Sequence, residues 1–448
     1  MPGGDLLVRG GTLVVPEGTF EADVLIEDGT IVMIGRGLSP ASHEVLDARG
    51  MLVLPGVVDE HVHMREPGLE YKDDFTHGTM AAAAGGVTTV IEMPNTLPPV
   101  DDADKLRRKA DLLSGRAYVD FALLGVLHDE NLDELEGMLG AGAVGFKAFL
   151  GPTTGNIPPP GDGSIYEALE KSSRLGFTVA FHGENWDLVR MFTERVRSEG
   201  KVDPLAHLRS RPPVCEEEAA QRIALYARRT GGRALIVHVA AAEAINVVRR
   251  ARSDGVEVYA ETCPHYLLLS ADDYERYGAL MKVNPPVRER DHQRELWRAV
   301  NDGTIQTLGS DHAPHSREEK SGDIMSAAAG VPAVQTFLPL MLDAALKGKM
   351  PITKIPELMA RNPARLFGLY PKKGSLSVGS DGDLAIVDPK AEWTVKAEDL
   401  YAKHPMTPFD GLRVRGKVVY TILRGVVVAE SGRVAISEPR GEWVIGRT

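Results

Sequence analysis

The chain has 448 residues, 43% of them hydrophobic, and a formal net charge of −12. This length suits one large domain with a smaller one, and the acidic balance argues against nucleic acid and acidic membranes as partners. The N-terminal residues lack the charged and then apolar regions of a signal peptide, and no apolar run is long enough to cross a bilayer. Two cysteines, Cys215 and Cys263, predict no disulfide framework. We therefore expect a soluble cytoplasmic globular protein.

Both ends of the chain are predicted to form β-structure. Residues 6–15 and 22–29 are short strand segments, and Asp28-Gly29 is a strong hairpin signal. From Gly374 onward, residues 384–388 and 417–423 are again strand-like. We expect residues 1–54 and 374–448 to pack together as one small β-sandwich domain built from both termini.

Residues 55–373 are predicted to form the main domain. Apolar, β-rich runs alternate there with helical segments. The expected strands cover residues 51–58, 87–95, 119–127, 143–150, 177–182, 234–239, 256–262 and 305–311. The expected helices cover residues 76–86, 101–113, 131–140, 165–175, 214–230, 241–254, 331–346, 352–360 and 363–367. This alternation predicts a parallel sheet covered by helices, and eight units of this size indicate a (β/α)8 TIM barrel. A doubly wound open sheet is the alternative, but its glycine-rich nucleotide turn is missing.

Polar residues follow most of these strands. His61 and His63 share one face at the end of the first strand, because side chains alternate along a strand, and two such imidazoles can bind one metal ion. Arg65 keeps the same parity if the strand continues. Alone, these would be two core histidines and a surface arginine. Further ligand-type residues at later strand ends are Lys147, His182, His238 and Asp311. Because barrel enzymes place their chemistry at strand C-termini, we predict a site for zinc or a similar divalent ion.

Lys147 lies inside an apolar strand, where an ammonium group is expensive to bury. Burial lowers the pKa of such an amine and leaves it nucleophilic. It can then take up carbon dioxide to form a carbamate, an anion able to bridge two metal ions. The alternatives are that Lys147 reaches the barrel mouth or pairs with a carboxylate such as Glu184.

Together these motifs resemble the amidohydrolase superfamily, and within it the cyclic-amide branch of dihydroorotases, hydantoinases and allantoinases. The motifs are His61-x-His63, Gly145-Phe146-Lys147, His182, His238 and Ser310-Asp311-His312-Ala313-Pro314-His315. The likeness runs over nearly the whole chain. It implies one metal ion on His61, His63 and Asp311, a second on His182 and His238, and carbamylated Lys147 between them. It also implies that hydroxide attacks a ring amide carbonyl, while Asp311 carries the proton to the leaving nitrogen.

Different segments of the sequence favour different substrates. The segments 63–68 and 93–96 are similar to dihydroorotases, whose matching arginine and asparagine, here Arg65 and Asn95, hold the substrate carboxylate. A guanidinium fork is a natural carboxylate clamp, although Arg65 can instead pair with Glu66 or Asp73. Asn284 and His315 match further substrate contacts of that family. In contrast, residues 261–266 and 391–395 are nearer to hydantoinases and allantoinases.

We therefore expect a dihydroorotase, which converts L-dihydroorotate to N-carbamoyl-L-aspartate in pyrimidine biosynthesis. The alternative is a hydantoinase (dihydropyrimidinase) or an allantoinase acting on a neutral cyclic ureide. An inactive scaffold homologue is an alternative of another class, which the complete ligand set disfavours. Relatives of this branch imply a homo-oligomer, a dimer or a tetramer. Loops 151–163 and 316–330 either cover the site or merely connect elements, and Cys263 is expected to be a packed thiol.

Overall fold

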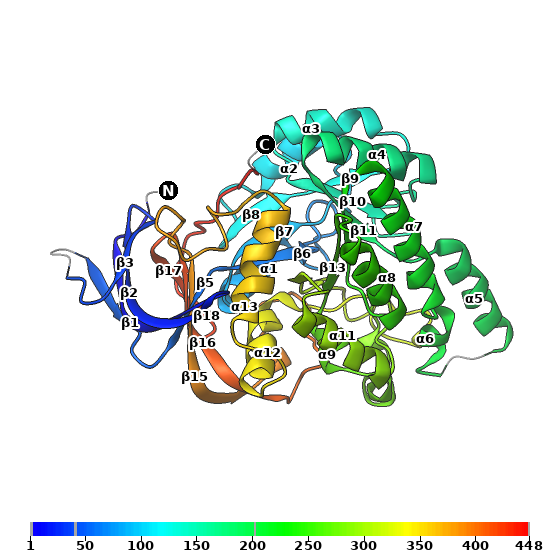
Figure 1. Cartoon of the computed structure of the whole chain (residues 1–448). Helices are drawn as coiled ribbons and strands as arrows, with labels where there is room; N and C mark the ends of the chain where they lie inside the picture. Colours follow the sequence, from blue (N-terminus) through cyan, green and yellow to red (C-terminus); the bar gives the residue numbers. More distant parts are fainter. Residues whose placement is uncertain (1–2, 40–42, 201–202, 447–448) are drawn as a thin grey trace.

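The computed structural model describes residues 3–39, 43–200 and 203–446. Two bodies lie side by side: a barrel ringed by helices, and a β-domain that carries the first and last strands of the chain (Figure 1). Among the described residues, no helix is both long and apolar enough to span a lipid bilayer.

Strands from both ends of the chain share one nine-stranded sheet in the β-domain. Its order is β18-β17-β16-β15-β5-β1-β2-β3, with β4 beside β1. The strands are β1 (Leu6–Val15), β2 (Gly18–Glu27), β3 (Thr30–Gly35), β4 (Glu44–Asp47), β5 (Leu52–Pro55), β15 (Leu384–Thr394), β16 (Arg413–Leu423), β17 (Val426–Glu430) and β18 (Arg433–Val434). The ends meet where β5 pairs with β1 in parallel and with β15 antiparallel. The predicted composite β-sandwich domain is thus present, whereas its limits at residues 54 and 374 stay a prediction.

Eight parallel strand positions form the barrel. They are β6 (Val57–Val62), β7 (Val87–Glu92), β8 (Asp120–Leu123) with β9 (Gly125–Leu127), β10 (Gly145–Phe149), β11 (Thr178–His182), β12 (Arg233–Val237), β13 (Val258–Thr262) and β14 (Thr307–Leu308). The circle closes where Val62 forms a parallel bridge with His312, and the His63 N–H donates to the His312 carbonyl at 2.7 Å. The (β/α)8 prediction is confirmed, and the open-sheet alternative is wrong.

Two predicted strands are divided in the structure. The predicted strand 51–58 separates at Gly56 into β5 of the terminal sheet and β6 of the barrel. The predicted strand 119–127 is interrupted at Leu124, so that β8 pairs with β7 and β9 pairs with β10. The last predicted strand, 305–311, is reduced to Thr307–Leu308.

Helices surround the barrel on its outer side (Figure 1). The predicted helices correspond to α1 (Phe75–Ala84), α2 (Ala103–Leu113), α3 (Leu135–Ala141), α4 (Asp162–Leu175), α7 (Val214–Thr230), α8 (Ala242–Ser253), α12 (Val334–Leu346) and α14 (Asn362–Leu366). The predicted helix 352–360 is α13 (Lys354–Pro356) followed by a π-helical turn at Glu357–Arg361. Helices that the sequence did not indicate are α5 (Trp186–Ser198), α6 (Ala206–Ser210), α9 (Pro264–Leu268), α10 (Tyr274–Tyr277) and α11 (Arg290–Asp302).

The N-terminal end of the barrel is closed by apolar packing. Residues of α14 and its C-terminal neighbour Phe367 join a buried cluster with Val58, Ala180 and Leu235, which lie on barrel strands. The Thr178 hydroxyl, at the start of β11, donates to the Leu366 carbonyl at 2.6 Å. This packing leaves the opposite end, where the strands finish, as the end at which a cavity can open.

Candidate active site

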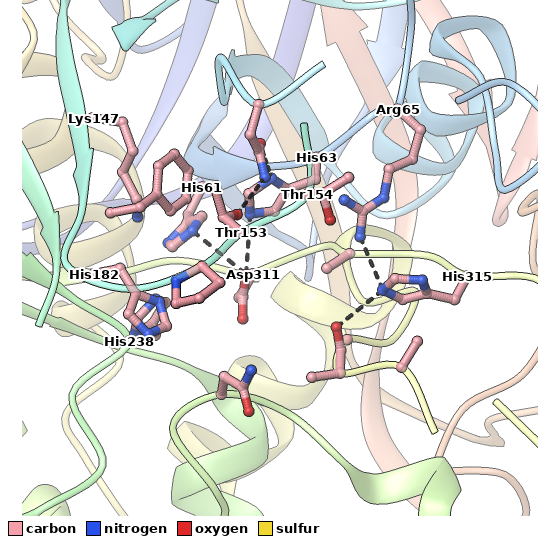
Figure 2. A pocket seen from close by; sticks show the side chains of 18 of the residues that line it. His61, His63, Arg65, Lys147, Thr153, Thr154, His182, His238, Asp311 and His315 are labelled. Carbon is pink, nitrogen blue, oxygen red and sulfur yellow. Dashed lines mark hydrogen bonds and ion pairs between the residues drawn. The ribbon is translucent and has the colours of Figure 1, made fainter. Parts of the chain in front are cut away.

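One cavity of about 390 Å³ lies at the C-terminal ends of the barrel strands, and all ten residues singled out from the sequence line it (Figure 2). They are His61, His63, Arg65, Asn95, Lys147, His182, His238, Asn284, Asp311 and His315. In Figure 2, Lys147, His182 and His238 lie on one side of Asp311, and Arg65 and His315 lie on the other.

His61, His63 and Asp311 form a compact group. His61 lies on β6 and His63 directly follows it, while Asp311 follows β14. Asp311 Oδ1 lies 3.4 Å from His61 Nε2 and 3.6 Å from His63 Nε2. Burial alone would raise the pKa of Asp311, but the two neighbouring histidines and His238 hold it well below its usual range. An ionised carboxylate with two imidazoles matches the donor set of a divalent ion, and their ligand atoms lie within 4.8 Å of one another.

Lys147, His182 and His238 form the second half of the site. The ring centroids of the two histidines are 4.6 Å apart. Lys147 is fully buried on β10, and burial lowers the pKa of its amine to about 8. Among the described residues, neither Lys147 Nζ nor His238 Nδ1 has a hydrogen-bond partner, although both atoms are buried. Such orphaned polar atoms fit a site that holds a further charged group.

The alternative pairing of Lys147 with Glu184 is wrong. Glu184 Oε2 instead lies 2.7 Å from His182 Nε2 and contacts the Arg211 guanidinium. The alternative in which Lys147 extends to solvent at the barrel mouth is also wrong. Its side chain lines the cavity but is fully buried, and its Nζ lies 5.3 Å from the centroid of the Phe149 ring.

Three site residues other than glycine adopt left-handed backbone conformations. Their φ angles are 67° for Arg65, 43° for His238 and 47° for Asp311. Because β6 ends at Val62, the strand does not continue to Arg65, and the condition for its predicted parity is not met; its side chain nevertheless lines the cavity. Strained backbone of this kind costs about 1–3 kcal/mol per residue and clusters at functional sites.

Carboxylate and amide groups outside the predicted metal positions orient the histidines. Asn95 Oδ1 lies 2.7 Å from His63 Nδ1, and the other end of its amide donates to Thr153 Oγ1 at 3.1 Å. Asn95 therefore has a structural partner at each end, in addition to its place on the cavity wall. Glu261, to which the sequence assigned no role, lies 2.8 Å from His61 Nδ1. Its signal was a carboxylate at the end of an apolar strand, like the predicted ligands.

The Arg65 side of the cavity is cationic. Arg65 Nε donates to the Pro314 carbonyl at 3.0 Å, and its Nη2 lies 3.3 Å from His315 Nε2. Glu66 pairs with Arg116 instead, so the predicted alternative of an Arg65–Glu66 pair is wrong. Lys72, which the sequence did not single out, also lines the cavity and pairs with Glu319 at 2.8 Å.

The two predicted loops border the cavity. Loop 151–163 contributes residues 152–154 to its wall, and loop 316–330 contributes residues 328–330. Closure of these loops over the site stays a prediction. Asn284 also faces the cavity, and its Oδ1 has no hydrogen-bond partner among the described residues. Cys263 is buried, and burial raises the pKa of its thiol well above the usual range, which agrees with a packed thiol.

Comparisons with known proteins agree with this geometry. The profile of the Amidohydrolase family matches residues 52–428. An allantoinase of Rubrobacter xylanophilus is 41% identical over 444 residues, covering 98% of this chain and 97% of that protein. An L-hydantoinase of Paenarthrobacter aurescens is 38% identical over 450 residues, covering 99% of this chain and 98% of that protein. The solved structure of an L-hydantoinase (dihydropyrimidinase) from Arthrobacter aurescens matches with a TM-score of 0.96 at 37% identity. The match covers 99% of this chain and 100% of that one.

These comparisons confirm the predicted superfamily and branch, and they do not support the expectation of a dihydroorotase. Divalent metal use agrees with both the family and the cluster of His61, His63 and Asp311. The chain therefore belongs to the amidohydrolase family, in its cyclic-amide branch.

Proposed function

We propose that this protein is a metal-dependent hydrolase that opens the ring of a neutral cyclic ureide, with allantoin as the first candidate and a hydantoin as the second. The observation that carries the proposal is the convergence of six ligand-type side chains in one cavity. They are His61, His63, Lys147, His182, His238 and Asp311. Relatives named allantoinase and L-hydantoinase support these substrates over dihydroorotate.

The ligand-type residues fit two divalent ions, and zinc suits a set of imidazoles and a carboxylate. His61, His63 and Asp311 would hold one ion, and His182 and His238 would hold the other. Ions bound there would activate a water molecule as nucleophile and polarise the carbonyl of the ring amide. Lys147 has a pKa of about 8, so more of its amine is neutral near pH 7 than in an ordinary lysine. A neutral amine can add to carbon dioxide and, with release of a proton to solvent, form a carbamate, whose negative charge would complement metal ions at both positions.

Asp311 is placed to move the proton. Its side chain lines the cavity, with Lys147, His182 and His238 on one side and Arg65 and His315 on the other (Figure 2). It can accept a proton from the attacking water and donate it to the ring nitrogen as the carbon–nitrogen bond breaks. The products are then a carboxylate and the released end of the opened ureide.

The Arg65 side of the cavity favours a substrate with a polar substituent on its ring. Arg65, Lys72 and His315 offer hydrogen-bonding groups there, and loop 316–330 contributes mainly small residues to the cavity wall. The ureido group of allantoin can accept hydrogen bonds from such donors. The cations Arg65 and Lys72 also suit the carboxylate of L-dihydroorotate, which keeps dihydroorotase as a third candidate, after allantoinase and hydantoinase.

The test is ring-opening activity on allantoin, a 5-substituted hydantoin and L-dihydroorotate, measured side by side with zinc or manganese and with bicarbonate. We expect the kcat/KM for allantoin to exceed that for L-dihydroorotate by at least about tenfold, or roughly 1.4 kcal/mol. A reversed preference would favour dihydroorotase. Absence of both activity and bound metal would favour the inactive scaffold.

A further inference from the structure

Glu261 lies between the two halves of the proposed metal centre. It is fully buried near the end of β13. Its Oε1 lies 2.8 Å from His61 Nδ1 and accepts a hydrogen bond from the backbone N–H of His238 at 3.0 Å. His61 belongs to one proposed metal position and His238 to the other. One carboxylate oxygen therefore contacts a residue from each half.

The other orienting groups act on one histidine each. Asn95 contacts the ring of His63, and Glu184 contacts the ring of His182. Glu261 differs because it contacts a ring in one half and a backbone amide in the other. That amide belongs to His238, whose φ of 43° is a left-handed conformation that residues with side chains rarely adopt. A hydrogen bond to a carboxylate helps to hold such a conformation in place.

The close approach of Glu261 to His61 depends on a glycine. A Cβ atom at Gly309 would lie 2.8 Å from Glu261 Cδ and 3.0 Å from His61 Cβ. The φ of Gly309 is not among the positive values of this chain, so its backbone conformation does not require glycine. The absence of a side chain at Gly309 is therefore explained by the room that Glu261 and His61 need.

The surroundings of Glu261 give little stability to the fold. Among the described residues, its Oε2 is buried with no hydrogen-bond partner. The neighbouring Glu60 is also buried, and neither of its carboxyl oxygens has a partner there. Unsatisfied buried carboxyl groups are destabilising, so a purely structural role does not explain why they lie here.

We propose that Glu261 is a positioning residue that couples the two metal positions, an inference that rests on the proposed function. It turns the His61 ring so that Nε2 faces Asp311, and it holds the backbone of His238. Orienting partners of metal ligands are worth about 10–100-fold in metal affinity. Loss of Glu261 should therefore weaken both positions together.

The test compares Glu261→Ala and Glu261→Gln with Glu184→Gln by zinc titration of the metal-free full-length protein against a chromophoric chelator. Glu261→Ala should raise the Kd of both positions by about 10–100-fold. Glu261→Gln keeps an acceptor oxygen and should show a smaller loss, again at both positions. Glu184→Gln is the matched control, because it should weaken one position and leave the other tight. The thermal unfolding midpoint of the metal-free Glu261→Gln variant should stay near that of the metal-free wild type.

The proposal would be overturned if both Glu261 variants still bind zinc tightly at two positions, or if they lose zinc binding at only one position. If Glu261→Ala does not fold, Gly309→Ala tests the same contact with Glu261 present, and it should also weaken zinc binding. Unchanged zinc binding in that variant would count against the inference. Failure of the proposed metal centre is a separate result, because the wild type itself would then bind no zinc, and a different substrate preference would leave the zinc titration unchanged.

Discussion

Two buried lysines show how differently one side chain can behave within a single fold. Lys147 on β10 has no hydrogen-bond partner among the described residues, and burial lowers its pKa to about 8. Lys373 is equally buried, but its Nζ contacts Asp120 and lies 2.7 Å from both Asp381 and Asp383. Burial alone would lower the pKa of Lys373, yet these carboxylates raise it above the usual range. Partners, rather than burial, decide whether a buried amine stays charged.

The two lysines also occupy opposite ends of the barrel strands. Asp120, which contacts Lys373, is the first residue of β8, and it also pairs with Arg424 at the end of β16. This paired network joins the barrel to the terminal sheet. Lys147 instead faces the cavity at the end where strands finish. The contrast follows the division of labour in barrels, in which strand C-termini carry chemistry and the opposite face carries stability.

Substitution of Lys373 should have the largest effect on stability. Lys373→Met leaves Asp381 and Asp383 buried without their cation, and breaking a buried ion pair costs about 3–5 kcal/mol. We expect the free energy of unfolding in urea to fall by that amount, while the kcat per folded molecule stays close to wild type. A stability loss below about 1 kcal/mol would contradict a structural role for this network.

The matched substitution at Lys147 should have the reverse pattern. Lys147→Met removes a proposed metal bridge, so kcat/KM should fall by about 100-fold or more, because even outer partners of metal ligands are worth 10–100-fold. The free energy of unfolding of the metal-free protein should stay the same or rise, since an unpartnered buried amine is lost. Retained activity together with a large loss of stability would remove the contrast between the two lysines.

Arg65 tests the cationic wall of the cavity. Charge-assisted hydrogen bonds contribute about 1.5–3 kcal/mol, so Arg65→Met should raise the KM for L-dihydroorotate by about 10–100-fold. The KM for allantoin, a neutral ring, should change by less than about tenfold. Equal effects on both substrates would show that Arg65 shapes the site without recognising charge.

The smallest expected effect is the pH dependence of the stability that the Lys373 network contributes to the fold. Burial alone would raise the pKa of Asp120, but Lys373 and Arg424 hold it below its usual value. The unfolded state therefore takes up this proton first as the pH falls. The stabilisation is present above the ordinary aspartate pKa of about 3.9 and is lost as the pH falls toward the lower folded value.

The measurement is urea unfolding of wild type and Lys373→Met at pH 7 and near pH 3.5. Because the variant lacks a main partner of Asp120, the difference in unfolding free energy between the two proteins should narrow at the lower pH. If the difference in unfolding free energy between the two proteins is the same at both pH values, Asp120 and Lys373 are not energetically coupled.

Much of the site could be predicted because parallel strands bring their ends together. His61, His182 and Asp311 lie far apart in the chain, but each ends or follows a barrel strand, and all line one cavity. Local conformation was harder to predict. Strand parity does not apply to Arg65, because the strand ends at Val62 and Arg65 itself has a left-handed backbone conformation. The alternation of residues in the sequence does not show where the strand ends.

Orienting partners were missed for a related reason. Lys72 contacts residues distant in sequence, and no local pattern marks it. Glu261 carries a local signal, as a carboxylate at the end of an apolar strand, but its partners His61 and His238 are distant in sequence. Helices α5 and α11 were missed although their sequences alternate polar and apolar residues with helical spacing. The substrate expectation rested on Arg65 and Asn95, but Asn95 is engaged by His63 and Thr153 in the structure. A residue type that matches a motif does not determine what its polar atoms contact.

The pairing of β5 with β15 has a consequence for synthesis of the chain. The second edge of β5 (Leu52–Pro55) stays uncovered until Leu384–Val387 of β15 has been synthesised. At roughly 5–20 residues per second, that interval on the ribosome lasts on the order of tens of seconds. An apolar strand edge left open for that time is a template for intermolecular pairing. Premature termination before β15 would therefore leave the nascent protein prone to aggregation even where the barrel is complete.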